Sequence, residues 1–464
     1  MTGHFSAAVS TLADLLVATC QGCEALMDKG LASQVTGITT DTRTVQPGEL
    51  FVALEGETFD GHHFAQQAMD KGAIAAVVRR GALSSANFPR LEVADTLVAY
   101  QTLGHWWRQQ KALPVVAITG SVGKTTTKEL VAAALGLFGS VLKTQANYNN
   151  EIGVPKTLLG LTDEHDYAVV EMGMRGPGEI ALLTQIAQPN VALITNVGTA
   201  HIGRLGSRQA IAQAKCELLR ELPASGIAVL NHDNALLMST AAAVAAAADP
   251  TLAWSGSQIT YGLEGGDVCG QLVGETLQVG DVQIPMPLPG RHNALNMLSA
   301  IATLQALKLD WKKLAQGITV SLPAGRAQVH KLPNDIWLLD ETYNAGTEAM
   351  IAALQLLADQ PGRRHIAVLG TMKELGAQSA RLHHQVGQTV ADLSLDYLLT
   401  LADPPESEAM RAGAKDIPSQ PFDSHEALAT HLRGMMQPGD RLLFKASRSV
   451  AMDKVIDQLL KDFA

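Results

Sequence analysis

The stretch that decides the fold is PVVAITGSVGKTTTKELVAAALGLFG, residues 114–139. An apolar, largely β-branched run ends at Thr119 and predicts a buried strand. The loop GSVGKT follows, and the residues after it predict a helix that ends at a glycine. Backbone N–H groups of such a loop, together with those of the helix N-terminus, converge on phosphate oxygens. The sequence therefore predicts an α/β domain with a phosphate-binding loop.

The loop carries the side chains that a nucleotide triphosphate needs. Lys124 is expected to neutralise β- and γ-phosphate oxygens, and the hydroxyl of Thr125 is expected to bind Mg²⁺. Ile118 occupies the first glycine position of the longer G-x-x-x-x-G-K-[ST] pattern, so only the shorter G-x-x-G-K-T is present. Its position between a strand and a helix supports the interpretation. The predicted nucleotide contacts of the loop are Gly120, Ser121, Val122, Gly123, Lys124, Thr125 and Thr126.

Two later strands end in side chains that suit the same chemistry. DYAVVEMG presents Glu171, a possible Mg²⁺ ligand, and VALITNVGTAH leads to His201. Each residue alone is as consistent with a structural role. In a doubly wound sheet, however, the carboxyl ends of parallel strands meet at one edge, so both are expected near Lys124. Lys215, in AIAQAKCELL, resembles a solvated surface lysine when taken alone.

The 464 residues correspond to three domains at about 150 residues each. Residues 1–113 predict a small α/β domain, and residues 114–323 predict a central doubly wound domain with the phosphate loop. Residues 324–464 predict a smaller open, Rossmann-like α/β domain. Its expected strands are IWLLDE, HIAVLGTM, DYLLTLAD and DRLLFKAS. The alanine run 241–248 predicts a helix.

Charge, cysteine content and hydrophobic runs exclude several classes of function. The net charge is -10 and no Lys/Arg run occurs, which argues against a nucleic-acid partner. Cys20 and Cys23 form one CxxC without further partners, and Cys216 and Cys269 are isolated. This pattern favours ordinary thiols in a reducing cytoplasm over a metal site. No export signal or uninterrupted apolar run of about 18 residues is present, so we expect a cytoplasmic protein without a membrane-spanning segment. We also expect a monomer.

The chain resembles the Mur ligases, the ATP-dependent amide-forming enzymes of peptidoglycan assembly, over nearly its whole length. The first domain carries TTDTRTVQPGELFVALEGETFDGHHF, which is similar to the uridine-nucleotide domain of that family. The motifs that carry the resemblance occur in the family's order: TGSVGKTTTKE, TQANYNNEIGVP, VVEMGMRGPGEI, TNVGTAHIGRLGS, AKCELL, LPGRHNALNMLSA, DETYNAG, VLGTMKELGAQS and KASRS.

The resemblance implies a reaction. ATP would phosphorylate a carboxylate of the substrate, and an amine would attack the acyl phosphate to give an amide, ADP and phosphate. YNAG and GTMKELG resemble the dipeptide-adding branch, whose substrates are UDP-N-acetylmuramoyl-tripeptide and D-alanyl-D-alanine. The Asp-Asn-Pro-Arg tetrapeptide typical of the diaminopimelate-adding branch is missing. Two alternative functions stay open: a sister ligase, including a folylpolyglutamate-type enzyme, and a P-loop NTPase without acyl transfer. The third residue of the peptide substrate, diaminopimelate or lysine, also stays open.

The resemblance also implies roles for residues around the phosphates. Thr125 and Glu171 match one Mg²⁺ site, and His201 matches a ligand of a second Mg²⁺. Lys215 matches a lysine that relatives carry as a carbamate, an anionic oxygen ligand. Asn149 and Asn150 match the amide near the γ-phosphate, without a choice between them.

Further matches concern the ends of the substrates. The resemblance places adenine near GRHNALN, ATP phosphates near Arg326, and ribose near Asp340 and Glu341. Here DETYNAGT replaces the more frequent Asp-Asp-Ser-Tyr-Asn-Ala-Asn-Pro, which leaves the contact of Glu341 open. The expected adenine residues are His292, Asn293 and Asn296; those for the uridine diphosphate are Thr40, Asp41, Thr42 and Arg43; those for the dipeptide carboxylate are Lys445, Ser447 and Arg448.

Overall fold

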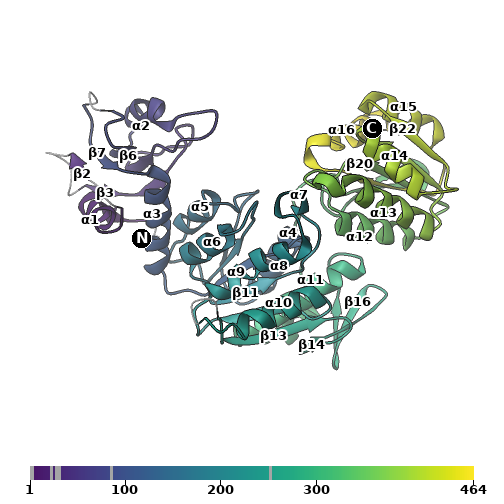
Figure 1. Ribbon diagram of the computed structural model, residues 1–464, viewed down its shortest axis with the longest axis horizontal. Helices are drawn as coiled ribbons and strands as arrows, with labels where there is room; N and C mark the ends of the chain where they lie inside the picture. Colours follow the sequence, from purple (N-terminus) through teal and green to yellow (C-terminus); the bar gives the residue numbers. More distant parts are fainter. Residues whose placement is uncertain (1–4, 21–23, 27–32, 84–86, 250–252, 464) are drawn as a thin grey trace.

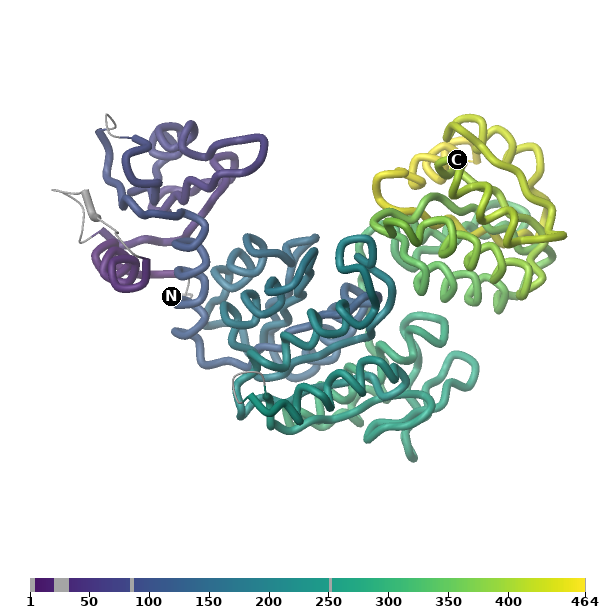
Figure 2. Tube along the Cα trace, in the orientation of Figure 1, coloured from purple at the N-terminus to yellow at the C-terminus, as the bar shows by residue number. Residues whose placement is uncertain are grey.

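The computed structural model describes residues 5–20, 24–26, 33–83, 87–249 and 253–463. Three α/β units follow one another along the chain, as predicted. The first and third units lie at opposite ends of the central one (Figures 1 and 2). Of the predicted CxxC pair, Cys23 lies outside the described residues.

The first unit is built on a five-stranded sheet in the order β2-β7-β6-β5-β4. All neighbours are parallel except β2 and β7. A two-stranded pair, β1 (Ala7–Ala8) with β3 (Gln34–Val35), lies beside it. The five strands are β2 (Glu24–Leu26), β4 (Gly37–Thr39), β5 (Glu49–Val52), β6 (Ala75–Arg79) and β7 (Arg90–Val93). The helices are α1 (Val9–Thr19), η1 (Gly61–Phe64), α2 (Ala65–Asp70) and α3 (Thr96–Gln109).

Helix α3 connects the first unit to the central one, because it packs against α1 on one side and against α5 and α6 on the other. The Trp107 indole N–H donates to the Leu161 carbonyl at 2.9 Å. The Arg108 Nε donates to the Ala187 carbonyl at 3.1 Å. Since α3 is shared in this way, the boundary at residue 113 stays a prediction.

The central sheet has seven strands in the order β14-β13-β12-β11-β8-β10-β9, all parallel. On β8, Val116 and Ile118 face a core shared with α4 and α11, whereas Val115 and Ala117 face a core shared with α3, α5 and α6. Such burial on both faces explains why the run 115–119 is uninterruptedly apolar. The strands are β8 (Val115–Thr119), β9 (Val141–Lys143), β10 (Tyr167–Glu171), β11 (Val191–Ile194), β12 (Ile227–Asn231), β13 (Ser257–Gly262) and β14 (Val268–Cys269).

The chain builds the sheet outward from β8, first through β9 and β10 on one side and then through β11 on the other. The loop after β8 therefore lies where the strand order reverses, the usual position of a ligand site in an open α/β sheet. The helices of this unit are α4 (Lys124–Leu135), α5 (Gly153–Leu159), α6 (Glu179–Ala187), α7 (Ile202–Leu205), α8 (Arg208–Lys215), α9 (Glu217–Arg220), α10 (Ala235–Ala245), α11 (Arg291–Ala306) and η2 (Trp311–Gln316).

Two features of the central unit differ from the expectation. The alanine run 241–248 is helical only to Ala245, where α10 ends. Residues 271–285 form a small antiparallel sheet of β15 (Gln271–Val273), β16 (Thr276–Val279) and β17 (Val282–Pro285). The sequence analysis did not predict this sheet, because its short strands alternate exposed and buried positions between glycine turns.

The third unit is a six-stranded sheet in the order β18-β19-β23-β20-β21-β22. Its four predicted strands are present, and β18 adds an antiparallel edge strand. The strands are β18 (Gln328–Leu332), β19 (Ile336–Asp340), β20 (Arg364–Gly370), β21 (Tyr397–Leu401), β22 (Ser419–Phe422) and β23 (Asp440–Lys445). The helices are α12 (Thr347–Ala358), α13 (Ser379–Asp392), α14 (Pro404–Gly413), α15 (His425–Met435) and α16 (Asp453–Asp462), with short turns η3 (Pro333–Asp335), η4 (Gly376–Gln378) and η5 (Arg448–Val450).

None of the helices in the described part of the chain combines the length and the apolar character needed to cross a bilayer.

Candidate active site

The phosphate loop joins β8 to α4 and depends on two glycines. Gly123, with φ 82°, precedes the first residue of α4. A Cβ on Gly120 would lie 1.9 Å from the Thr195 Oγ1, so no side chain fits there. The Lys124 ammonium donates to the Gly120 carbonyl at 2.9 Å, which holds the cation over the loop. This is the arrangement in which backbone N–H groups and a lysine face an anion together.

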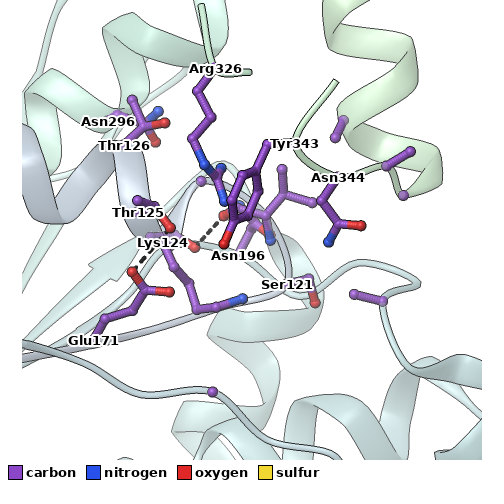
Figure 3. Close-up of a pocket in the computed structure, with 18 of the residues that line it drawn as sticks. Ser121, Lys124, Thr125, Thr126, Glu171, Asn196, Asn296, Arg326, Tyr343 and Asn344 are labelled. Carbon is purple, nitrogen blue, oxygen red and sulfur yellow. Dashed lines mark hydrogen bonds between the residues drawn. The ribbon is translucent and has the colours of Figure 1, made fainter. Parts of the chain in front are cut away.

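The loop is held from the neighbouring strand end by residues that the sequence analysis did not single out. Thr195 Oγ1 donates to the Val122 carbonyl at 2.7 Å. The Asn196 amide accepts from the Val122 N–H at 3.0 Å and donates to the Val122 carbonyl at 2.9 Å. Figure 3 shows Asn196 beside the loop. The sequence signal for Thr195 and Asn196 was the polar stretch TNVG at the end of this strand, which also leads to the predicted His201.

Glu171 and Thr125 lie together at the same edge of the sheet (Figure 3). The Thr125 hydroxyl donates to Glu171 Oε2 at 3.0 Å, and the Asn149 side chain donates to Oε1 at 2.9 Å. Glu171 is only 3% exposed, and the Lys128 ammonium lies 4.0 Å from it. Two adjacent oxygens, one of them anionic, are a donor set that suits a hard divalent cation.

The two predicted lysines differ in their surroundings. Burial lowers the pKa of Lys124, with Arg326 adding to the effect and Glu171 opposing it. Lys215, at the end of α8, is 1% exposed and does not line the cavity described below. No residue in the described ranges gives its ammonium a hydrogen bond or an ion pair. Burial, together with the charge of Lys124, holds the pKa of Lys215 well below its usual range. Lys215 is therefore not the solvated lysine that its sequence context alone indicates.

His201 is held by the third unit. Its φ of 66° is left-handed, and it directly precedes α7. Its Nδ1 lies 2.5 Å from Glu374 Oε2, and the Arg204 guanidinium reaches the other oxygen at 3.4 Å. Burial lowers the pKa of His201, and the partly opposing effect of Glu374 does not cancel it. Because a carboxylate only accepts, Nδ1 carries the proton and Nε2 keeps a free lone pair.

A second carboxylate from the third unit binds the loop after β11, which also carries His201. Glu348, in the first turn of α12, accepts from the Thr199 N–H at 2.8 Å and from the Thr199 hydroxyl at 3.0 Å. Neither Glu348 nor Glu374 was predicted, since only the folded chain brings them to the end of β11.

Lys124, Glu171 and His201 line one cavity of about 500 Å³, whose walls come from the central and third units. Within it, the Arg326 guanidinium stacks 4.1 Å from the centre of the Tyr343 ring, and Figure 3 shows both beside the phosphate loop. Tyr343 and Asn344 also line it and were not predicted. The predicted residues that line it are Ser121, Val122, Gly123, Lys124, Thr125, Thr126, Asn149, Asn150, Glu171, His201, His292, Asn293, Asn296, Arg326, Glu341 and Lys445.

The N-terminal end of α11 contributes the polar wall of the cavity. Asn296 accepts from the Thr127 hydroxyl at 3.1 Å and donates to Asn293 Oδ1 at 3.1 Å. Asn293 in turn donates to the Pro289 carbonyl at 2.7 Å. Burial lowers the pKa of His292, which favours the neutral imidazole. This wall is therefore polar without a fixed positive charge.

The acidic pair after β19 is divided between two environments. Asp340 accepts from the Thr342 N–H and hydroxyl, at 3.0 and 2.6 Å, and does not line the cavity. Glu341 lines the cavity, accepts from the Ala327 N–H at 3.0 Å and lies 3.5 Å from the Lys445 ammonium. Burial lowers the pKa of Lys445.

The remaining predicted residues lie outside the cavity. Ser447 accepts from the Lys373 N–H at 2.9 Å, and exposed Arg448 pairs with Asp453 at 2.8 Å. In the first unit, Arg43 chelates Asp41 through contacts of 2.9 and 2.7 Å. This hydrogen bonding is the main cause that lowers the pKa of Asp41 to about 2.

Further contacts hold the turn of the first unit that carries Asp41 and Arg43. Thr42 donates to Gln67 at 3.2 Å, and its carbonyl accepts from the Lys71 ammonium at 2.7 Å. Thr40 is partly buried, and the Arg43 side chain is 87% exposed. The Thr42 backbone and side chain are thus held by neighbouring residues, and Arg43, paired with Asp41, is exposed at the surface.

Family models match each part of the chain. The Mur ligase family catalytic domain matches residues 34–107, the Mur ligase middle domain matches 118–304, and the Mur ligase glutamate ligase domain matches 325–448.

Whole-length relatives agree with these matches. A UDP-N-acetylmuramoyl-tripeptide–D-alanyl-D-alanine ligase from Synechocystis is 54% identical over 92% of this chain and 93% of its own. The crystal structure of MurF from Acinetobacter baumannii is 33% identical, with a TM-score of 0.87 over 97% of this chain and 98% of that one. A MurF ligase from Thermotoga maritima in complex with ADP is 29% identical, with a TM-score of 0.78 over 92% and 97%. This chain belongs to the Mur ligase family.

Proposed function

We propose that this chain is an ATP-dependent ligase that joins D-alanyl-D-alanine to UDP-N-acetylmuramoyl-tripeptide, a step of peptidoglycan synthesis. The observation that carries the proposal is the cavity in which the phosphate loop of the central unit faces Arg326 and Lys445 of the third unit. Curated relatives of this name match 92% or more of the chain, and a relative has been solved with ADP.

Formation of an acyl phosphate requires positively charged groups close together. A carboxylate is a poor acyl donor because oxide cannot leave. Transfer of the γ-phosphoryl group of ATP to the carboxylate oxygen gives an acyl phosphate and ADP. The dipeptide amine then attacks the carbonyl carbon, phosphate leaves, and the amine loses a proton as the amide forms. Lys124, Arg326 and the loop N–H groups offset the repulsion between the γ-phosphate and the carboxylate.

The donor set at the edge of the sheet fits Mg²⁺, which would supply charge stabilisation to the phosphates. Thr125 and Glu171 would hold one ion, and His201 would contribute its free Nε2 to a second. Lys215 as a carbamate would supply anionic oxygens. A buried lysine of lowered pKa supports this assignment, because only the neutral amine reacts with CO₂.

Each domain has a part in the proposal. Residues 1–113 hold the uridine diphosphate at the turn Thr40–Arg43, residues 114–323 activate the carboxylate, and residues 324–464 bring in the dipeptide. Lys445 lines the cavity and would bind the dipeptide carboxylate, with Ser447 and Arg448 reached on closure. We place the enzyme in the cytoplasm, where ATP and nucleotide sugars are made, and we infer that it acts as a monomer.

The test is an omission experiment with ATP, Mg²⁺, UDP-N-acetylmuramoyl-tripeptide and D-alanyl-D-alanine. Phosphate release that requires every component, with a pentapeptide product by mass, supports the ligase. Release from ATP alone, unchanged by the other components, would identify a non-ligase NTPase. Turnover with diaminopimelate or lysine as the amine, on the dipeptide nucleotide, would identify a sister ligase.

A further inference from the structure

A second cavity, of about 260 Å³, adjoins the first and has no part in the proposal above. Glu151, Arg175, Glu179, Leu182 and Leu183 line it. Arg175 and Glu179 line both cavities, so they form the wall between the two. The second cavity is therefore next to the position at which the carboxylate of the substrate is activated.

The loops that support Glu171 also position this second cavity. Asn149 binds Glu171 through its side chain, and its carbonyl accepts from the Gly173 N–H at 2.7 Å. Glu151 follows Asn149 by two residues, and Arg175 follows Gly173 by two. The cavity thus lies between the N-terminal ends of α5 and α6, at a fixed place relative to Glu171.

Helix α5 also lies towards the uridine turn of the first unit. Arg43 is the main cause of the lowered pKa of Asp41, and the charge of Lys156, on α5, contributes to it. Under the function proposed above, a nucleotide anchored at that turn would extend its peptide past α5 towards Lys124. The second cavity is therefore on the side from which the peptide arrives.

The cavity contains charged groups of both signs over an apolar base. The Arg175 guanidinium is exposed, and no described residue forms a hydrogen bond or an ion pair with it; only its backbone N–H donates, to Glu179 Oε2 at 2.9 Å. The Glu151 carboxylate is also without a described partner. Leu182 is partly buried and Leu183 is 1% exposed, so the apolar surface at the base of the cavity comes mainly from Leu182.

This combination matches one kind of side chain. The third residue of the tripeptide carries the carboxylate to be activated, so its side chain begins beside Lys124. A lysine side chain ends in an ammonium alone. A diaminopimelate side chain ends in a carbon that carries both an ammonium and a carboxylate. A guanidinium binds such a carboxylate in a two-pronged geometry, while carboxylates bind the ammonium and leucines cover the methylenes.

We propose that the cavity lined by Arg175, Glu151 and Glu179 binds the zwitterionic end of the third residue, and that the enzyme selects a diaminopimelate-type tripeptide over a lysine-type one. This inference rests on the ligase function proposed above. Arg175 binds the carboxylate, and the two glutamates bind the ammonium. A lysine side chain would place its ammonium near Arg175 with no carboxylate to compensate, so Arg175 also acts against that substrate.

The test compares kcat/KM for the two UDP-N-acetylmuramoyl-tripeptides at saturating ATP and D-alanyl-D-alanine. The wild-type enzyme is expected to favour the diaminopimelate form. Arg175→Ala should lower kcat/KM for that form by at least about tenfold, mainly through KM, because a charge-assisted contact is lost. The value for the lysine form should stay within about twofold or rise, and Arg175→Lys should restore part of the preference.

Control measurements distinguish failure of this inference from failure of the proposed ligase function. Arg381→Ala removes an exposed arginine of α13 that, among the described residues, bonds only to Gln378, and it should leave both values unchanged. Equal use of both tripeptides by the wild-type enzyme, or an equal loss for both in Arg175→Ala, would overturn the inference while leaving the ligase intact. Turnover of neither tripeptide would instead refute the proposed function. ATP binding by each variant, measured by fluorescence, confirms that the protein is folded.

Discussion

His201 of the central unit and Glu374 of the third unit are joined by a 2.5 Å contact between Nδ1 and a carboxylate oxygen. A carboxylate that fixes the protonated nitrogen of a histidine leaves the other nitrogen ready to bind a metal ion. The third unit thus determines how a proposed metal ligand of the central unit is oriented.

The contact predicts a change in metal requirement. Glu374→Ala should raise the Mg²⁺ concentration for half-maximal ligation by about tenfold, since carboxylate partners of this kind commonly contribute 10- to 100-fold in metal affinity. Arg204→Ala, which removes the weaker 3.4 Å contact to the same carboxylate, is the control and should shift it far less. A Mg²⁺ titration of phosphate release measures both. An unchanged midpoint in Glu374→Ala would contradict the orienting role.

Lys124 is expected to matter for catalysis and little for folding. Its ammonium is desolvated, as its lowered pKa indicates, so its removal relieves a cost of burial. Lys124→Ala should lower kcat by about 10²- to 10³-fold, the range found when one preorganised donor to a developing anion is lost. The melting temperature should not fall. Lys454→Ala, an exposed lysine on α16, serves as control, and normal ligation by Lys124→Ala would refute the proposed mechanism.

Lys215 and Lys128 form a matched pair for detecting a carbamate. Both are 1% exposed. The Lys128 ammonium donates to the Thr144 carbonyl at 2.8 Å and pairs with Glu129 at 3.1 Å. Lys215 lacks such partners among the described residues, and its lowered pKa favours the reactive neutral amine.

Incubation with ¹³C-bicarbonate should therefore give a carbamate carbon signal by NMR. The signal should vanish in Lys215→Ala and persist in Lys128→Met. If the signal survives in Lys215→Ala, the carbamate is on another amine.

The lowered pKa of Asp41 predicts that its contribution to stability depends on pH. Its carboxyl titrates at about 2 in the folded chain, against 3.8 without its partners, chiefly because Arg43 donates to it. The ionised carboxylate therefore stabilises the fold fully above about pH 4, and this contribution is lost as the pH falls towards 2.

Arg43→Ala should return the pKa of Asp41 towards 3.8, as followed by carbon-detected NMR of the side chain. Lys71→Met removes a 2.7 Å contact to the Thr42 carbonyl of the same turn and should leave the pKa of Asp41 unchanged. A pKa that stays near 2 without Arg43 would show that other groups hold the charge.

Local patterns predicted much of the fold and the part of the site that lies on strand ends. The run 115–119 is apolar because both of its faces are buried, and Lys124, Glu171 and His201 follow strands that are neighbours in the sheet. The predicted residues meet because parallel strands deliver their ends to one edge. Their chemical roles stay predictions until the variants above are measured.

The residues that sequence reasoning missed depend on contacts between distant segments. Tyr343 lies in YNAG, which the sequence analysis used only as a family motif, and its role in the cavity arises from stacking with Arg326. Glu348 and Glu374 resemble ordinary helix and loop carboxylates until the third unit meets the end of β11. Asp340, expected at the ribose, accepts hydrogen bonds from Thr342 within its own turn, where a short side chain satisfies the backbone, and its contact with the ribose stays a prediction.

The closeness of Thr195 to Gly120 constrains how the phosphate loop can evolve. Any side chain at position 120 would collide with the Thr195 hydroxyl, and that hydroxyl is itself bonded to the loop at Val122. A side chain at position 120 therefore needs a change at Thr195, which directly follows β11, to make room for it. Positions 120 and 195, far apart in the sequence, are thus expected to vary together rather than singly.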